Sequence, residues 1–144
     1  RFIAMMKDFT ATWAGKSPST ADFQKVVERH VVPAMNATGD GKMDWFFQQW
    51  VYGTEIPRYT ENLKIEKAGG DGYRISGKVT QEGVGKDFRA MLPLYLELDK
   101  NQSARFALLP MIGSSTRTLD VVVKPPRMPR RVILNARGEV LARD

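Results

Sequence analysis

The chain contains no cysteine and only one histidine, His30. The lack of cysteine excludes disulfides, thiolate metal ligands and a cysteine nucleophile, and it leaves the cellular localisation undecided. A single imidazole excludes the paired histidines of an His-Glu-x-x-His zinc site. No apolar run approaches the roughly 20 residues that cross a bilayer, so the sequence predicts no membrane span.

Positively charged residues are in modest excess over negatively charged ones. The formal net charge is +6 and the isoelectric point is near 9.7. Basic residues are spread along the chain and cluster only at Lys124–Arg131, where prolines separate them. Nucleic-acid surfaces interleave basic residues with aromatic ones that stack on bases. We therefore expect no nucleic-acid partner.

The first part of the chain has helical periodicity. Apolar residues recur at helical spacing over residues 2–13, and Gly15 is expected to end this helix. A second helix is predicted with Thr20 as its N-cap, and the ring of Pro33 is expected to end or kink it. A third helix, Lys42 to about Val51, is rich in tryptophan and phenylalanine, which predicts burial on most of its circumference. The chain starts without an initiator methionine or a leader, as expected of a segment from a longer chain.

From Tyr59 onward the apolar period changes to two, which is typical of strands with one buried face. Hairpin or tight turns are expected at Gly69–Gly72, at residues 100–102 and at residues 135–138. The expected strands cover residues 59–66, 73–80, 88–99, 105–112, 117–123, 131–134 and 140–142. About seven short strands with regular turns indicate an immunoglobulin-like or fibronectin-like antiparallel β-sandwich. We predict an α+β chain with a helical segment at residues 1–57 and the sandwich at residues 58–144.

Two sequence features have the residue types of a catalytic or nucleotide site. His30 lies on the apolar stripe of the second helix, which favours a packed, hydrogen-bonded histidine over a metal ligand or base. The segment Gly72–Val79 nearly matches a phosphate-binding P-loop, but Val79 stands where a hydroxyl must reach magnesium. Its residues also alternate as in a strand, so we predict an ordinary strand.

A loop after the second helix carries several oxygen ligands at the spacing of a calcium-binding loop. Phe47 replaces the bidentate glutamate of such a loop, and Lys42 brings a positive charge into it. We therefore predict a turn and a helix cap at these positions. The matching residues are Asn36, Thr38, Asp40, Gly41 and Asp44.

The basic segment Lys124–Arg131 contains a Pro-x-x-Pro sequence with flanking arginines. Peptide-recognition domains accept such sequences as polyproline helices. Its position between two expected strands favours a stiff crossover that connects the two sheets of the sandwich.

The sequence of the third helix is the most specific feature. Asp44–Pro57 reads Asp-Trp-Phe-Phe-Gln-Gln-Trp-Val-Tyr-Gly-Thr-Glu-Ile-Pro. It resembles a signature near the end of the catalytic domain in aminopeptidase N-like zinc metallopeptidases, the gluzincin or membrane alanyl aminopeptidase family. There a Phe-Phe-x-x-Trp helix is followed by glycine and proline and then by a β-sandwich. Ser19–Phe23 also resembles the start of the family's preceding helix.

The resemblance implies a parent enzyme that removes N-terminal residues from peptides. Its zinc would be held by two histidines and a glutamate, with a glutamate base and a tyrosine at the oxyanion, all upstream of Arg1 in the family layout. We therefore expect no catalytic, cofactor-binding or metal-binding residue and no enzymatic activity in this segment, while zinc belongs to the parent. Its expected partners are the remainder of the parent chain and, through it, the peptide substrate.

In that setting the segment would be a non-catalytic scaffold and spacer. Cut free, its helices should expose apolar surface, and we expect either self-association or a marginally stable helical part. The alternative is a stand-alone β-sandwich binding module that recognises a protein or a polysaccharide.

Overall fold

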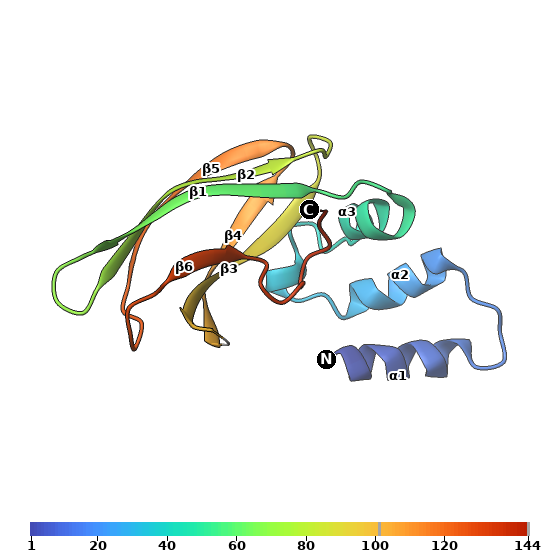
Figure 1. Ribbon diagram of the computed structural model, residues 1–144. Helices are drawn as coiled ribbons and strands as arrows, with labels where there is room; N and C mark the ends of the chain where they lie inside the picture. The colour runs from blue at the N-terminus through green and yellow to red at the C-terminus, as the bar shows by residue number, and fades with distance from the viewer. Residues whose placement is uncertain (101, 144) are drawn as a thin grey trace. The chain divides into compact units, whose positions relative to one another are not determined.

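The computed structural model describes residues 1–100 and 102–143, and these form two compact units (Figure 1). The helical unit covers Arg1–Thr54, and the sandwich unit begins at Glu55. Within the described part of the chain, no helix is both long and apolar enough to cross a membrane.

The first two helices of the helical unit follow the apolar periodicity. Helix α1 (Phe2–Trp13) ends shortly before Gly15, whose φ is +69°. Helix α2 (Thr20–Arg29) is capped by Ser19 rather than by the expected Thr20. The Ser19 hydroxyl accepts a hydrogen bond from the Asp22 backbone N–H at 3.2 Å, and the Asp22 carboxylate accepts one from the Ser19 N–H at 3.1 Å. This reciprocal pairing is a capping box, which fixes the start of α2 one residue before our prediction.

The end of α2 precedes Pro33, as expected. Pro33 itself begins a short 3₁₀ helix, η1 (Pro33–Met35), where its missing N–H costs nothing. The rings of Phe9 and Phe23 meet edge to face with centroids 5.1 Å apart. This contact joins α1 to α2.

The third helix is shorter and more exposed than predicted. Helix α3 (Asp44–Phe47) begins two residues later than expected and continues directly into a π-helical turn, η2 (Gln48–Tyr52). Only Phe47 is fully buried, whereas Val51 and Tyr52 expose 47% and 55% of their surface. The expectation of burial around most of the helix is therefore wrong within this chain. Gly53 ends the turn where a Cβ would lie 2.7 Å from two backbone oxygens.

The described residues of the sandwich unit form six antiparallel strands in two three-stranded sheets, which confirms the α+β, sandwich-like fold. The strands are β1 (Arg58–Lys67), β2 (Tyr73–Glu82), β3 (Arg89–Asp99), β4 (Gln102–Ile112), β5 (Ser115–Val123) and β6 (Arg131–Leu134). Sheet A has the order β1-β2-β5, and sheet B has the order β4-β3-β6. The β1–β2 hairpin turns where glycines predicted it, with a hydrogen bond of 2.8 Å from the Ala68 N–H to the Gly72 oxygen. The turn expected at residues 100–102 includes Asn101, which lies outside the described residues.

The predicted seventh strand at residues 140–142 is wrong. The Asn135 side chain donates to the Val140 carbonyl at 2.6 Å and accepts from the Val140 N–H at 3.0 Å. Because the N–H and the C=O of Val140 both hydrogen-bond to this side chain, neither group is available to pair with a neighbouring strand. Farther along, Arg143 makes an isolated parallel bridge to Arg58 at the start of β1. The predicted turn before this segment is present.

The core lies between the inner faces of the two sheets. Strand β3 contributes four leucines at alternating positions, and each is at most 7% exposed. Gln81 is a fully buried polar residue whose Nε2 donates to the Gly113 carbonyl at 2.7 Å. The nine core residues are Ile75, Val79, Leu92, Leu94, Leu96, Leu98, Met111, Leu119 and Val132.

Candidate functional site

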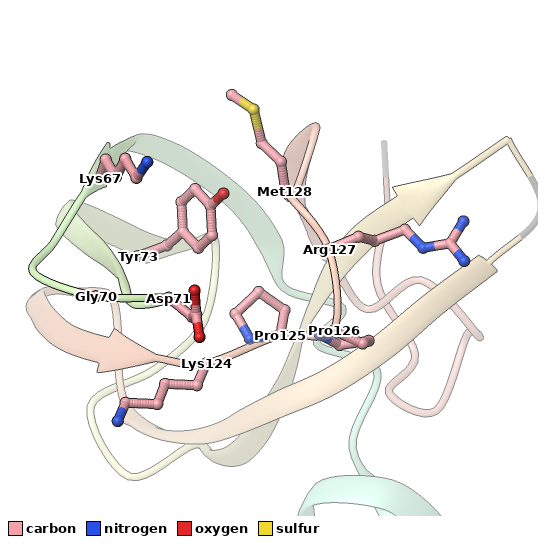
Figure 2. A pocket seen from close by; sticks show the side chains of 9 residues that line it. All are labelled: Lys67, Gly70, Asp71, Tyr73, Lys124, Pro125, Pro126, Arg127 and Met128. Carbon is pink, nitrogen blue, oxygen red and sulfur yellow. The ribbon is translucent and has the colours of Figure 1, made fainter.

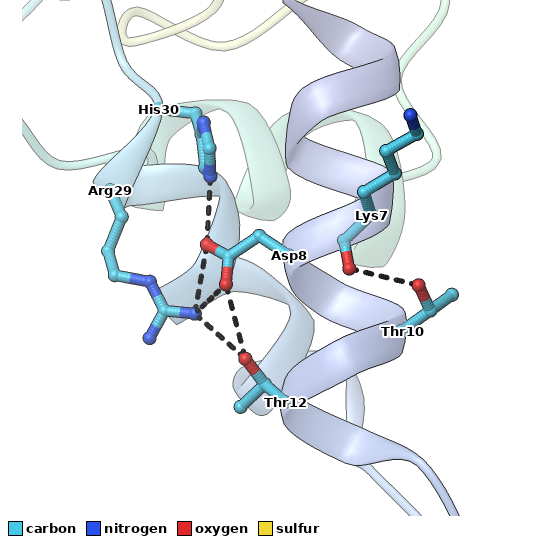
Figure 3. A network of polar contacts seen from close by, with 6 residues as sticks. All are labelled: Lys7, Asp8, Thr10, Thr12, Arg29 and His30. Carbon is cyan, nitrogen blue, oxygen red and sulfur yellow. Dashed lines mark hydrogen bonds and ion pairs between the residues drawn. The ribbon is translucent and has the colours of Figure 1, made fainter.

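His30 belongs to a polar network between α1 and α2 (Figure 3). The Asp8 carboxylate is at its centre and bonds to His30 Nε2 at 2.8 Å. Arg29 Nη2 lies 3.2 Å from each Asp8 oxygen, and the Thr12 hydroxyl donates to the same carboxylate at 3.2 Å. The network therefore links residues of α1 to the last residue and the C-cap of α2.

The network fits a structural role. The prediction that His30 is hydrogen-bonded is confirmed, but His30 is the C-cap of α2 rather than part of its apolar stripe, because the helix ends at Arg29. A nucleophile must bond to the imidazole that activates it. Thr12 instead bonds to Asp8, on the carboxylate side of the pair. The arrangement holds two helices together and activates no hydroxyl that the structure describes.

Asp8 should make the helical unit sensitive to acid. Its pKa lies below the ordinary value of 3.8, chiefly because His30 bonds to the carboxylate and also because Arg29 and Thr12 lie beside it. A carboxyl with a lowered folded-state pKa stabilises the fold above its unfolded pKa, and this stabilisation is lost as the pH falls through the folded one. We expect urea denaturation, followed by tryptophan emission, to show a loss of stability below roughly pH 4 that is smaller in Asp8→Asn.

The same measurement has an internal reporter and a control. All three tryptophans lie in the helical unit, at Trp13, Trp45 and Trp50. The exposed Asp87→Asn, in the sandwich unit, should leave the acid transition of the tryptophans unchanged. An acid transition that is identical in Asp8→Asn and in the unmodified chain would contradict the role of Asp8.

The loop that resembles a calcium site bonds to itself as the predicted turn, but the predicted helix cap is wrong, because Met43 is the N-cap of α3 and no side chain caps that helix. Asn36 Oδ1 accepts from the Gly41 N–H at 2.9 Å, and Asp40 Oδ1 accepts from the Thr38 hydroxyl at 2.6 Å and the Lys42 N–H at 2.9 Å. The Thr38 hydroxyl is the main reason that the pKa of Asp40 is lowered. Among residues 1–100 and 102–143, no group of three histidine, aspartate or glutamate side chains is placed to hold a metal ion.

The segment that resembles a P-loop is a strand, as predicted. Residues 73–79 all lie in β2, and the chain continues as strand to Glu82 with no helix N-terminus for a phosphate. Gly77 has φ +140°, and a Cβ there would lie 2.0 Å from the Asn62 carbonyl oxygen. Glycine is therefore needed at this position for close strand packing.

The basic proline segment is confirmed as a crossover, from β5 in sheet A to β6 in sheet B. Pro129 is buried, and the next N–H, of Arg130, donates to the Glu97 carbonyl at 2.8 Å. Arg127 reaches Asp99 at 3.4 Å. Because Pro129 is covered, the crossover does not present both prolines of the Pro-x-x-Pro sequence to a recognition domain.

The crossover forms one wall of a cavity of about 390 Å³ in the sandwich unit (Figure 2). The other wall is the tip of the β1–β2 hairpin. Sequence reasoning identified the basic crossover but not its hairpin wall, because only the register brings Lys67, Tyr73 and Val123 into one row. The lining residues are Lys67, Gly70, Asp71, Tyr73, Lys124, Pro125, Pro126, Arg127 and Met128.

Comparison with known proteins adds no assignment to this geometry. No family model, curated protein or solved structure matches the chain.

Proposed function

We propose that this chain is a non-catalytic scaffold and spacer at the C-terminal end of a zinc-dependent aminopeptidase. The parent would hydrolyse N-terminal residues from peptides, with its zinc held upstream of this segment. The helical unit would end the helical wall of the catalytic domain. The sandwich unit would hold the following part of the parent chain at a fixed distance.

The observation that carries the proposal is the direct passage from the aromatic helix to the sandwich. The helical run of α3 and η2 contains Phe46, Phe47 and Trp50 and ends at Gly53. After Pro57 the chain enters β1 at once, with Arg58 as its first residue. This is the order of parts that the sequence resemblance implies, from the Phe-Phe-x-x-Trp helix through glycine and proline to the first strand.

The two units suit different parts of that role. The sandwich unit has its own core, in which nine residues are at most 9% exposed, so it can act as a rigid spacer. In the helical unit, large apolar side chains are instead exposed to solvent, and Phe2 and Ile3 are 69% and 70% exposed. Exposed apolar groups of this size are typical of surfaces that another protein segment covers.

The complete reading frame and the purified segment test the proposal together. We expect the upstream reading frame to encode an His-Glu-x-x-His motif followed by a second glutamate. The purified 144-residue chain should bind no stoichiometric zinc and should not hydrolyse alanine or leucine 4-nitroanilide, with or without added zinc. Atomic absorption and absorbance assays measure both. Zinc bound at one per chain, turnover by the segment alone, or an upstream frame without the motif would overturn the proposal.

The isolated chain should self-associate through its helical unit. Phe2 and Ile3 lie next to each other on α1 and are both mostly exposed. We expect light scattering to show a mass that rises with protein concentration, and the double variant Phe2→Ser, Ile3→Ser to shift this rise to concentrations at least several-fold higher.

A matched control for this prediction is the double variant Met91→Ser, Leu108→Ser. It removes two apolar side chains that are 53% and 46% exposed, but in the sandwich unit. Association should persist in this control. A compact monomer at all concentrations, or an equal loss of association in both double variants, would count against the helical surface.

A further inference from the structure

We propose that the cavity between the β1–β2 hairpin and the proline crossover binds an acidic peptide segment of another protein. This site is independent of the peptidase assignment, because every lining residue belongs to the sandwich unit. A volume of about 390 Å³ lies within the range of about 300 to 1,000 Å³ that is usual for ligand pockets.

The strand register places the cavity at one end of the inner face of sheet A. Ile65, Ile75 and Val121 form one cross-strand row, and Ile75 is part of the core. Two residues farther along each strand, the next row on the same face contains Lys67 and Tyr73. The cavity therefore begins at the end of the apolar core, where the row of Lys67 and Tyr73 follows the row of Ile75.

Each wall has a backbone hydrogen bond that restrains it. The hairpin tip is closed by the Ala68–Gly72 hydrogen bond, and Gly70 has φ +67°. The crossover contains prolines that restrict its backbone, and near its end the Arg130 N–H donates to the Glu97 carbonyl. A preformed site avoids the ordering entropy that a flexible site loses on binding.

The charges of the cavity favour an anionic ligand. Lys67 and Lys124 make no ion pair or hydrogen bond with the residues that the structure describes, and both are exposed. Arg127 is already engaged by Asp99 at 3.4 Å, and Figure 2 shows its side chain extending away from Tyr73 and Asp71. Two ammonium groups without partners can therefore pair with ligand carboxylates.

The remaining lining residues narrow the ligand to a peptide. Asp71 provides a carboxylate that can accept main-chain N–H groups, and Figure 2 places it beside Tyr73 and facing the crossover. Pro125 and Met128 provide apolar surface for a neighbouring aliphatic side chain. The walls offer only one aromatic ring, that of the half-buried Tyr73, and thus no broad flat face for a sugar. Alternating acidic and aliphatic residues match this combination.

Fluorescence anisotropy with the complete chain tests the site. The probe is a fluorescein-labelled, end-blocked hexapeptide of alternating glutamate and leucine, and its comparison peptide has glutamine in place of glutamate. We expect the glutamate peptide to bind at low ionic strength, more weakly as salt is added, and the glutamine peptide to bind at least about tenfold more weakly. The double variant Lys67→Gln, Lys124→Gln should weaken binding of the glutamate peptide by about tenfold.

The matched control is Lys64→Gln, Lys78→Gln, which removes the same charge from the opposite face of sheet A. It should leave the affinity within about twofold of the unmodified chain. If both double variants lost affinity for the glutamate peptide equally, the binding would be a non-specific attraction by the positive charge of the chain, and the proposed site would be wrong. Equal binding of the two peptides, no binding at millimolar concentration, or tighter binding of oligogalacturonate than of the glutamate peptide would also overturn it.

Discussion

Replacing Gly77 by alanine is expected to lower the free energy of unfolding of the sandwich unit by about 4 kcal/mol. Gly77 lies in the central strand of sheet A, opposite Leu63 of β1 and Leu119 of β5. Its φ of +140° is accessible to glycine and strained for alanine. In addition, the new Cβ would lie 2.0 Å from the Asn62 carbonyl oxygen and 3.0 Å from the Leu63 Cα.

The size of this effect follows from which atoms would have to move. The contacts are backbone atoms of β1, so a side-chain rotation cannot relieve them. The two strands would have to separate locally, and the ladder hydrogen bonds beside Gly77 would be lost. Urea denaturation followed by far-ultraviolet circular dichroism measures the change.

A glycine in the same hairpin provides the control. A Cβ added to Gly69, at the hairpin turn, would meet no atom within 4 Å. Gly69→Ala should therefore change stability by less than about 1 kcal/mol. If Gly77→Ala unfolded at the same urea concentration as Gly69→Ala, the close approach of β1 and β2 at Asn62 would be wrong.

Truncating Leu94 to alanine is expected to lower the free energy of unfolding of the sandwich unit by about 3 kcal/mol. Leu94 is 0% exposed and belongs to the core cluster between the sheets. It also lies in the central strand of sheet B, with Ala107 of β4 on one side and Leu134 of β6 on the other. The loss combines the transfer of a buried side chain with the cavity left behind, because packed neighbours relax only in part.

Met91→Ala on the same strand is the control for Leu94→Ala. Its side chain is 53% exposed, so truncation should change stability by less than about 1 kcal/mol. Similar losses in the two variants would mean that β3 does not present its leucines to a common core. Tryptophan emission, which reports only on the helical unit, separates a change in the sandwich unit from a global loss of structure.

The strands were easier to predict than their ends and their partners. Alternation along residues 88–99 is a local property, and β3 (Arg89–Asp99) follows it almost residue for residue. The absence of a seventh strand depended on two hydrogen bonds between Asn135 and Val140, which no periodicity reveals. In the same way, Ser19 became the cap of α2 because Asp22 stands three residues later and completes the capping box.

The aromatic helix shows a limit of composition as a guide. Its tryptophans and phenylalanines predicted burial, yet Phe46 is 38% exposed and Tyr52 is 55% exposed. The composition of a helix indicates how much apolar surface it could bury. The segments that pack against the helix decide how much of that surface is covered.

The sequence by itself determined the class of the chain. The change of apolar period from 3.6 to two near Tyr59 determined the order of helices and strands, and a single histidine excluded a paired-imidazole zinc site. Only the tertiary structure decided that Asp8 meets His30 and that the hairpin tip faces the crossover, since these pairs are 22 or more residues apart. Periodicity is a property of neighbouring residues, whereas a site is made by segments that packing and strand register bring together.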